Sequence, residues 1–276
     1  MNVTCGKKAG FCYGIKNAVS STEKILNEYN KVACLGELLH NEAVLNQLKA
    51  NGLEIIDTIE EGKKYHKVVL RAHGVTKDIY KKAKKMDIDI YDNTCPKVKV
   101  IHHYLEEYNK RNYSVIIIGE KEHPEVIGTM SFADDVYVIE NMDDIDRLPR
   151  LNKVLCVAQT TFNSLKYQEM VETLTRKYDH IKIINTICNS TYERQKETKE
   201  IAKTVDMMVI IGGLKSSNTK KLYDISKGIC KEAIWIQTDD DIKLEECKKY
   251  HSIGVMAGAS TPDFLINSVV EKIRGY

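Results

Sequence analysis

Three cysteines occur at wide and regular spacings in the 276-residue chain, since Cys12, Cys95 and Cys188 are 83 and then 93 residues apart. Each of them opens a stretch with a helical pattern. The positive end of a helix favours the thiolate form of cysteine, which is the form that binds metals. Three convergent thiolates could hold a zinc ion with an open position, or an iron–sulfur cluster with one iron that lacks a protein ligand. The residue types alone do not decide between these two centres.

Two further sets of polar residues follow apolar segments, with one member of each set in every third of the chain. The first set has the same spacings of 83 and 93 residues and consists of His40, His123 and Ser216. The second set is looser, at 87 and 100 residues, and consists of His73, Thr160 and Ser260. Ordinary strand-to-helix loops are also polar. The cysteines and the first polar set share the spacings of 83 and 93 residues, so coincidence is the weaker explanation. The shared spacings indicate an internal threefold repeat.

Neutral or weakly cationic hydrogen-bond donors dominate this group, namely His40, His73, His123, Ser216, Asn218 and Ser260. Several of them stand at predicted helix N-termini, which suit anions. Such a set suits a diphosphate. The sequence contains neither a P-loop nor a G-x-G-x-x-G motif, so a nucleotide cradle of either kind is unsupported.

Glu125, two residues after His123, is the best candidate for a general acid. A carboxyl group in a water-poor pocket beside a negatively charged substrate has a raised pKa and can donate a proton. Thr160 could orient a hydroxyl group or relay the proton. The ordinary structural alternatives are a carboxylate in the first turn of a helix and a helix N-cap.

Short apolar runs alternate with helical patterns along the chain. We expect strands at residues 32–35, 68–70, 115–118, 154–157, 207–211 and 252–256. We expect helices at residues 15–28, 97–109, 164–177, 191–203 and 262–273. This alternation indicates parallel sheets covered on both faces, and in such sheets ligands lie beyond the carboxyl ends of the strands. The predicted fold is therefore α/β: three similar small α/β domains with parallel sheets in a pseudo-threefold trefoil around a central cavity, with domains at 1–95, 96–187 and 188–276.

Charge and composition narrow the class of protein. The net charge is +2, from 41 basic and 39 acidic residues, which argues against a general nucleic-acid binder. No apolar run approaches the roughly 18 residues that span a bilayer, and the first residues lack an apolar signal region. We therefore expect a cytoplasmic monomer with neither nucleic-acid nor membrane partners.

Short motifs in all three thirds of the chain, in order, are similar to those of one family. They are G-F-C-Y-G at Cys12, H-N at His40, A-H-G-V at His73, T-C-P at Cys95, H-P-E-V at His123, Q-T-T at Thr160, T-I-C at Cys188, S-S-N at Ser216 and A-G-A-S-T-P at Ser260. With these motifs the chain resembles the 4-hydroxy-3-methylbut-2-enyl diphosphate reductase (LytB/IspH) family over essentially its whole length. Tyr13 stands where a small residue is common, and Asn189 follows the third cysteine. Neither departure removes a ligand.

The resemblance implies that Cys12, Cys95 and Cys188 hold one [4Fe–4S] cluster, whose open iron binds the terminal hydroxyl group of the substrate. Glu125 would donate a proton, with Thr160 assisting. The substrate-binding residues would be His40, His73, His123, Thr160, Thr161, Ser216, Ser217, Asn218 and Ser260. The implied reaction is the reductive dehydroxylation of 4-hydroxy-3-methylbut-2-enyl diphosphate to isopentenyl and dimethylallyl diphosphate, the last step of the methylerythritol phosphate pathway of isoprenoid synthesis. No flavin or nicotinamide motif is visible, so ferredoxin or flavodoxin is the expected electron donor.

Three other functions fit part of the pattern. A hydro-lyase could use a three-cysteine cluster to expel a hydroxyl group without electrons. An iron–sulfur sensor or electron carrier would explain the cysteines but would have little use for the histidine, serine and asparagine set. A zinc protein with three cysteine ligands is the third alternative, and colour and metal analysis would distinguish it.

Overall fold

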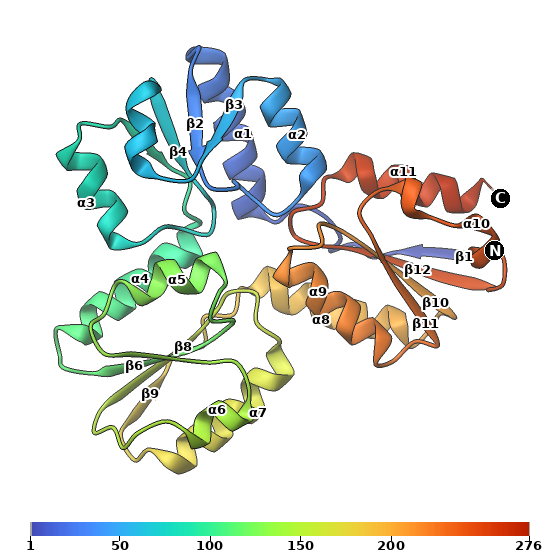
Figure 1. Cartoon of the computed structure of the whole chain (residues 1–276). Helices are drawn as coiled ribbons and strands as arrows, with labels where there is room; N and C mark the ends of the chain where they lie inside the picture. The colour runs from blue at the N-terminus through green and yellow to red at the C-terminus, as the bar shows by residue number, and fades with distance from the viewer. Residues whose placement is uncertain (1, 276) are drawn as a thin grey trace. The chain divides into compact units, whose positions relative to one another are not determined.

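Three four-stranded sheets organise the computed structural model, which describes residues 2–275, and every strand pairing in them is parallel (Figure 1). The six predicted strands and five predicted helices are confirmed, with bounds that differ by at most two residues. The chain forms two compact units. One unit contains residues 2–16, 39–47 and 189–275, and the other contains residues 17–38 and 48–188. Within the described residues, every helix is too short or too polar to span a lipid bilayer.

Sheet A lies in the first unit and has the strand order β1-β12-β10-β11. Its strands are β1 (Asn2–Cys5), β10 (Met207–Ile211), β11 (Glu232–Ile236) and β12 (Ser252–Ala257). The helices of this unit are α8 (Asn189–Ala202), α9 (Ser217–Lys227), α10 (Leu244–Cys247) and α11 (Asp263–Arg274), with the short 3₁₀ helix η2 (Asp239–Asp241). The unit also contains the first turns of α1 (Tyr13–Glu28) and α2 (Glu42–Ala50), which continue into the other unit.

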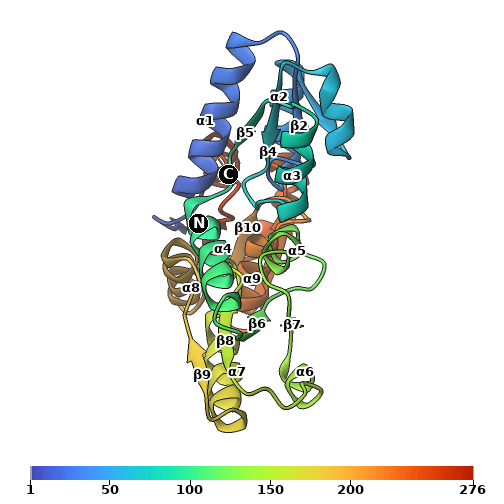
Figure 2. The same ribbon diagram turned by 90° about the vertical axis from the view of Figure 1, so that its left-hand side faces the viewer.

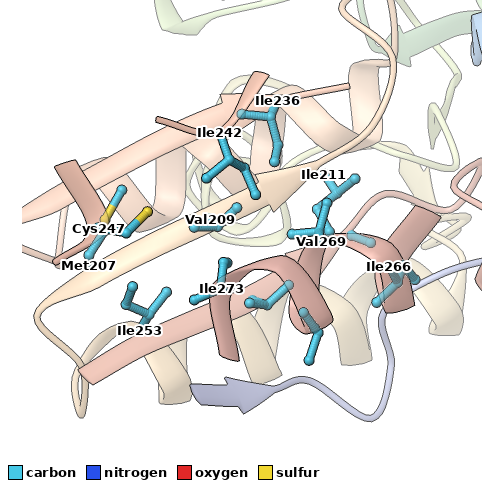
Figure 3. Close-up of a cluster of buried hydrophobic side chains, with 13 residues drawn as sticks. Met207, Val209, Ile211, Ile236, Ile242, Cys247, Ile253, Ile266, Val269 and Ile273 are labelled. Carbon is cyan, nitrogen blue, oxygen red and sulfur yellow. The ribbon is translucent and has the colours of Figure 1, made fainter. Parts of the chain in front are cut away.

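The strand β10 shows why sheet A needs helices on both faces. Successive side chains of a strand point to opposite faces. Met207, Val209 and Ile211 accordingly pack in one apolar cluster with α11 (Figure 3). Met208 and Ile210 pack in a second cluster with α8 and α9. Burial on both faces explains why this strand appears in the sequence as a continuous apolar run.

Sheet B lies in the second unit and has the order β3-β2-β4-β5. Its strands are β2 (Val32–Leu35), β3 (Leu53–Ile56), β4 (Lys67–Leu70) and β5 (Ile90–Asp92). The associated segments are α3 (Lys77–Lys85) and the 3₁₀ helix η1 (Ile59–Lys64). Figure 2 shows α1 and α3 on opposite sides of these strands.

Sheet C also lies in the second unit and has the order β7-β6-β8-β9. Its strands are β6 (Ser114–Ile118), β7 (Val136–Ile139), β8 (Val154–Ala158) and β9 (Ile181–Ile183). Its helices are α4 (Pro96–Asn109), α5 (Pro124–Met130), α6 (Met142–Asp146) and α7 (Ser164–Lys177). Val115 and Ile117 face the apolar cluster that includes α4 and α5, whereas Ile116 and Ile118 face the cluster that includes α6 and α7.

The three sheets share one internal order, which bears out the repeat seen in the spacings. The strand that leads to each cysteine stands at a sheet edge, namely β1, β5 and β9. Its neighbours are β12, β4 and β8, followed by β10, β2 and β6. The first strand of the chain thus completes the sheet of its last third: β1 falls within the predicted domain 1–95 but pairs with β12. The predicted boundaries at residues 95/96 and 187/188 remain a prediction.

Candidate functional site

The three regularly spaced cysteines stand at the starts of long helices. Cys12 directly precedes α1, Cys95 is the N-cap of α4, and Cys188 directly precedes α8. All three side chains are half-buried, and none of the eight cysteines, which all lie among residues 2–275, forms a disulfide. By contrast, burial raises the pKa of the thiols of Cys34 and Cys156, inside β2 and β8, to about 12. Accessible thiols at helix N-termini fit thiolate ligands of a metal or iron–sulfur group, and thiols buried in a sheet do not.

One backbone hydrogen bond is repeated at all three cysteines. The N–H of each cysteine donates to a carbonyl oxygen in the loop that follows the adjacent strand of the sheet. The bonds run from Cys12 to Ala259 at 3.1 Å, from Cys95 to Ala72 at 3.0 Å and from Cys188 to Thr160 at 3.0 Å. The same loops carry Ser260, His73 and Thr160, which are the second polar set of the sequence. Each cysteine is therefore tied to a loop that bears a hydrogen-bonding side chain.

Arg194 fastens the loop before Cys12 to helix α8. Its side chain is only 3% exposed. Its Nε donates to the carbonyl of Lys8 at 2.8 Å, and its Nη2 donates to the carbonyl of Gly10 at 2.9 Å. Its Nη1 donates to the carbonyl of Ser190, in the first turn of α8, at 3.1 Å. Fixing these carbonyls fixes the approach of the chain to Cys12.

Sequence reasoning missed Arg194, although one signal was present. The buried face of α8 carries polar residues at helical spacing, namely Thr191, Arg194, Gln195 and Thr198. A helix that buries polar side chains on one face must satisfy their hydrogen bonds inside the protein. The pattern could have marked this face as part of a polar site rather than as a solvated surface.

Glu125 and Thr160 form a buried pair in the second unit. Glu125 is 3% exposed, and its Oε1 accepts the N–H of Thr160 while its Oε2 accepts the Thr160 hydroxyl, both at 2.6 Å. Burial raises the pKa of Glu125 to about 7, the two Thr160 hydrogen bonds oppose that rise, and the nearby Glu120 charge adds to it. Near neutral pH the carboxyl group can therefore both hold and release a proton, which is what a general acid requires.

Two of the predicted histidines lie beside this pair. His123 is the N-cap of α5, and its Nδ1 accepts the N–H of Glu125 at 3.1 Å. A neutral His123 therefore carries its proton on Nε2 and is a donor there. The rings of His73 and His123 meet edge to face, with centroids 5.3 Å apart. The structure thus brings His73, His123, Glu125 and Thr160 together through direct contacts.

Thr161 is half-buried, and its hydroxyl oxygen accepts a hydrogen bond from the Gln159 amide nitrogen at 3.0 Å. The carbonyl oxygen of the Gln159 amide accepts the N–H of Glu120 at 2.9 Å. Gln159 was not singled out from the sequence. Its position two residues before a predicted substrate-binding threonine was the available signal.

The first unit holds a second group of predicted residues. The Ser260 hydroxyl donates to the carbonyl of His40 at 3.1 Å. A Cβ placed on Gly213 would lie 2.3 Å from the same carbonyl oxygen, so only glycine permits this approach. Gly213 leads to Ser216, the N-cap of α9, whose side chain accepts the N–H of Thr219 at 3.2 Å.

Ser217 and Asn218 lie in the first turn of α9 and are 7% and 4% exposed. This unit therefore places the loop of His40, which follows β2, against the loops of Ser216 and Ser260, which follow β10 and β12 of sheet A. The meeting of the residues of the two units at one cavity stays a prediction.

Comparisons with known proteins agree in the family that they indicate. The sequence pattern of the LytB protein family matches residues 3–274. The 4-hydroxy-3-methylbut-2-enyl diphosphate reductase of Alkaliphilus oremlandii is 39% identical over 278 residues, which cover 99% of this chain and 99% of that protein. The protein of the same name from Clostridioides difficile is 37% identical over 274 residues, covering 98% of each chain.

Solved structures are also similar. The E-1-hydroxy-2-methyl-but-2-enyl-4-diphosphate reductase from Plasmodium falciparum has a TM-score of 0.93 and 30% identity, covering 98% of this chain and 87% of that chain. A second structure, of (E)-4-hydroxy-3-methyl-but-2-enyl diphosphate reductase, described as the terminal enzyme of the non-mevalonate pathway, has a TM-score of 0.72 and 35% identity, covering 100% of both chains.

These likenesses confirm the predicted fold class, α/β with three similar parallel sheets and their helices. The family is one of iron–sulfur oxidoreductases of isoprenoid synthesis. The chain therefore belongs to the LytB family, the family of the 4-hydroxy-3-methylbut-2-enyl diphosphate reductases.

Proposed function

We propose that this chain reduces 4-hydroxy-3-methylbut-2-enyl diphosphate to isopentenyl and dimethylallyl diphosphate. The relatives that carry the name of this activity match the chain over nearly its full length. The observation that carries the proposal is the repeated hydrogen bond at the three cysteines. It couples each half-buried thiol to a loop with a donor or acceptor side chain, so that cofactor ligands and substrate-binding groups occur in pairs.

The cofactor in this proposal is one [4Fe–4S] cluster held by Cys12, Cys95 and Cys188. When bound through three thiolates, such a cluster supplies single electrons and one iron that is open to a substrate oxygen. The residues fit it because all three thiols are half-buried at helix N-termini. The other five cysteines lack this combination: Cys5 is exposed in β1, and the rest are buried.

In this proposal the predicted hydrogen-bond donors hold the substrate diphosphate. The donor on Nε2 of His123 and the first turn of α9 support this assignment. Helix N-termini add a favourable dipole for an anion. The full set in the proposal is His40, His73, His123, Thr160, Thr161, Ser216, Ser217, Asn218 and Ser260.

Glu125 is the proton donor in this proposal. The allylic C–O bond breaks, the leaving hydroxyl group takes one proton and departs as water, and the allylic carbon frame takes two electrons and a second proton. Glu125 supplies the first proton from its buried carboxyl group, whose pKa burial raises to about 7. Thr160 orients that carboxyl group through two hydrogen bonds of 2.6 Å.

The two electrons come from an external carrier. The chain contains no recognisable flavin or nicotinamide motif, and a cluster held by the three cysteines would supply electrons singly. We assign this role to ferredoxin or flavodoxin, and we assign the enzyme as a monomer. Both assignments are testable by reconstitution with the purified carrier and by the mass of the protein in solution.

The test is an anaerobic assay of the purified protein with the allylic diphosphate, with and without a chemical reductant, and with product analysis by mass spectrometry. We expect both five-carbon diphosphates only when the reductant is present. Loss of the hydroxyl group without reductant would indicate a hydro-lyase. Iron without diphosphate binding would indicate a sensor or electron carrier, and zinc in place of iron would reject the cluster.

A further inference from the structure

The N-terminal end of helix α9, whose place in the fold Figure 1 shows, carries a group of buried polar side chains. These residues are the N-cap Ser216 and the first-turn and next-turn residues Ser217, Asn218, Thr219 and Lys221, and each of them is at most 9% exposed. Sequence reasoning marked the two serines and the asparagine but not the lysine. A lysine is almost never this deeply buried without compensating contacts, and one contact of Lys221 lies within α9 itself.

The contact between Lys221 and Ser217 fixes the direction of a hydroxyl group. Lys221 Nζ donates to Ser217 Oγ at 3.0 Å, one helical turn away, and both side chains are buried. An ammonium group has protons but no lone pair, so Ser217 must accept in this bond. The hydroxyl proton of Ser217 is therefore directed away from Lys221.

The hydroxyl oxygen of the neighbouring Ser216 is also an acceptor within this helix end. Ser216 Oγ accepts both the N–H of Thr219 at 3.2 Å and the Thr219 hydroxyl at 2.9 Å. Its own proton is thereby also left to be donated. The amide oxygen and nitrogen of Asn218 are buried, and neither has a hydrogen-bond partner among the described residues. Buried polar groups normally find partners, so an absent ligand explains this side chain best.

An anion such as a diphosphate offers only hydrogen-bond acceptors, and the hydroxyl groups at the N-terminal end of α9 offer hydrogen-bond donors. The predicted substrate-binding set consists of histidines, serines, threonines and one asparagine, none of which carries a permanent charge. Burying a multiply charged anion against neutral groups alone is costly, and a nearby cation reduces that cost. Lys221 places an ammonium group one helical turn after Ser217 and within hydrogen-bond distance of its hydroxyl oxygen.

We propose that Lys221 is a positioning residue for the diphosphate: it holds Ser217 as a donor and supplies the positive charge of this helix end. The proposal rests on the proposed function, because it names how the same substrate is bound. Lys220, at the preceding position of α9, provides a matched control. It is exposed, and its Nζ pairs with Asp224 at 2.9 Å on the solvent side.

The experiment compares Lys221→Met, Lys221→Arg and Lys220→Met with the unmodified holoenzyme. Binding of the allylic diphosphate is measured by calorimetry without reductant, and kcat and KM are measured with it. Loss of a charged hydrogen bond should weaken binding by about 10- to 100-fold. Lys221→Met should raise Kd and KM by that factor, with kcat within about threefold and iron content unchanged. Lys221→Arg should restore most of the affinity, and Lys220→Met should bind normally.

A double-mutant cycle with Ser217→Ala separates positioning from general structural support. If Lys221 acts through Ser217, Lys221→Met should cost much less in the Ser217→Ala background than alone. Unchanged Kd in Lys221→Met, or full additivity of the two losses, would overturn the proposal. If the unmodified holoenzyme neither binds nor reduces the allylic diphosphate, the proposed function itself has failed instead.

Discussion

Replacing Thr160 by valine should shift the pH dependence of turnover upward. The Thr160 hydroxyl donates to Glu125 at 2.6 Å, and this bond favours the ionised carboxylate and so lowers the pKa of Glu125. Valine keeps the shape of threonine but cannot donate. The backbone N–H of residue 160 still donates to the other carboxylate oxygen, so only one of the two opposing bonds is removed.

The size of the shift follows from the hydrogen bond that is lost. A hydrogen bond to a charged group is worth roughly 1.5–3 kcal/mol, and one pKa unit corresponds to about 1.4 kcal/mol. The pKa of Glu125, which burial raises to about 7 in the unmodified protein, should rise by about 1 to 2 units in Thr160→Val. A general acid works only while protonated, so kcat should fall above pH 7 in the unmodified enzyme and only above about pH 8 in the variant.

The assay is anaerobic turnover with a reduced viologen dye between pH 5.5 and 9, with rates expressed per cluster. Glu125→Gln is the control, since it should lower kcat by about two or more decades and abolish this alkaline limb. An alkaline limb that stays at the same pH in Thr160→Val, or that survives in Glu125→Gln, would refute the assignment of Glu125 as the proton donor.

Three other changes have expected outcomes. Gly213→Ala forces a Cβ against the carbonyl of His40, so KM should rise at least about tenfold, whereas Gly228→Ala, whose Cβ would meet nothing closer than 3.5 Å, should leave KM unchanged. Arg194→Leu removes three side-chain hydrogen bonds, including those to the carbonyls of Lys8 and Gly10, so iron should be lost from the protein faster in air, and the free energy of unfolding should drop by about 3 kcal/mol or more. Burial lowers the pKa of His102 from its ordinary value of 6.5 to about 4 in the folded protein. As the pH falls below about 6.5, His102 is therefore protonated in the unfolded state but not in the folded state, which favours unfolding. Unfolding monitored by urea should therefore show up to about 3 kcal/mol of stability lost between pH 7 and 4, and His102→Gln should remove that part of the slope. An equal slope in both proteins, normal iron retention in Arg194→Leu, or equal KM in the two glycine variants would contradict these expectations.

The central strands could be predicted from the sequence because they are covered on both faces. In β6 and β10 nearly every side chain is buried, which produces an unbroken apolar run. The edge strands β5 and β9 have three residues each, and their central residues are exposed, so they carry no such run. The residues of β1 also give no indication of the strand with which β1 pairs. It pairs with β12, which is about 250 residues away in the sequence.

The candidate site was predictable where the repeat of the chain carried it. Equal offsets marked the cysteines and the polar loops, because each follows a strand at an equivalent place in its sheet. Arg194 and Lys221 were missed because a charged residue on a helix most often faces solvent. Only packing decides that these two point inward, where they hold carbonyl groups and a serine hydroxyl group.

The most direct test of the account is the iron and sulfide content of anaerobically purified protein in which single cysteines are replaced. The unmodified chain should contain about four irons and four sulfides, as one [4Fe–4S] cluster requires. Cys12→Ser, Cys95→Ser and Cys188→Ser should each lose most of the cluster, whereas Cys156→Ala, in the buried strand β8, should retain it. A full cluster in any of the three serine variants, or zinc in the unmodified protein, would contradict the central claim that these three cysteines hold the cluster.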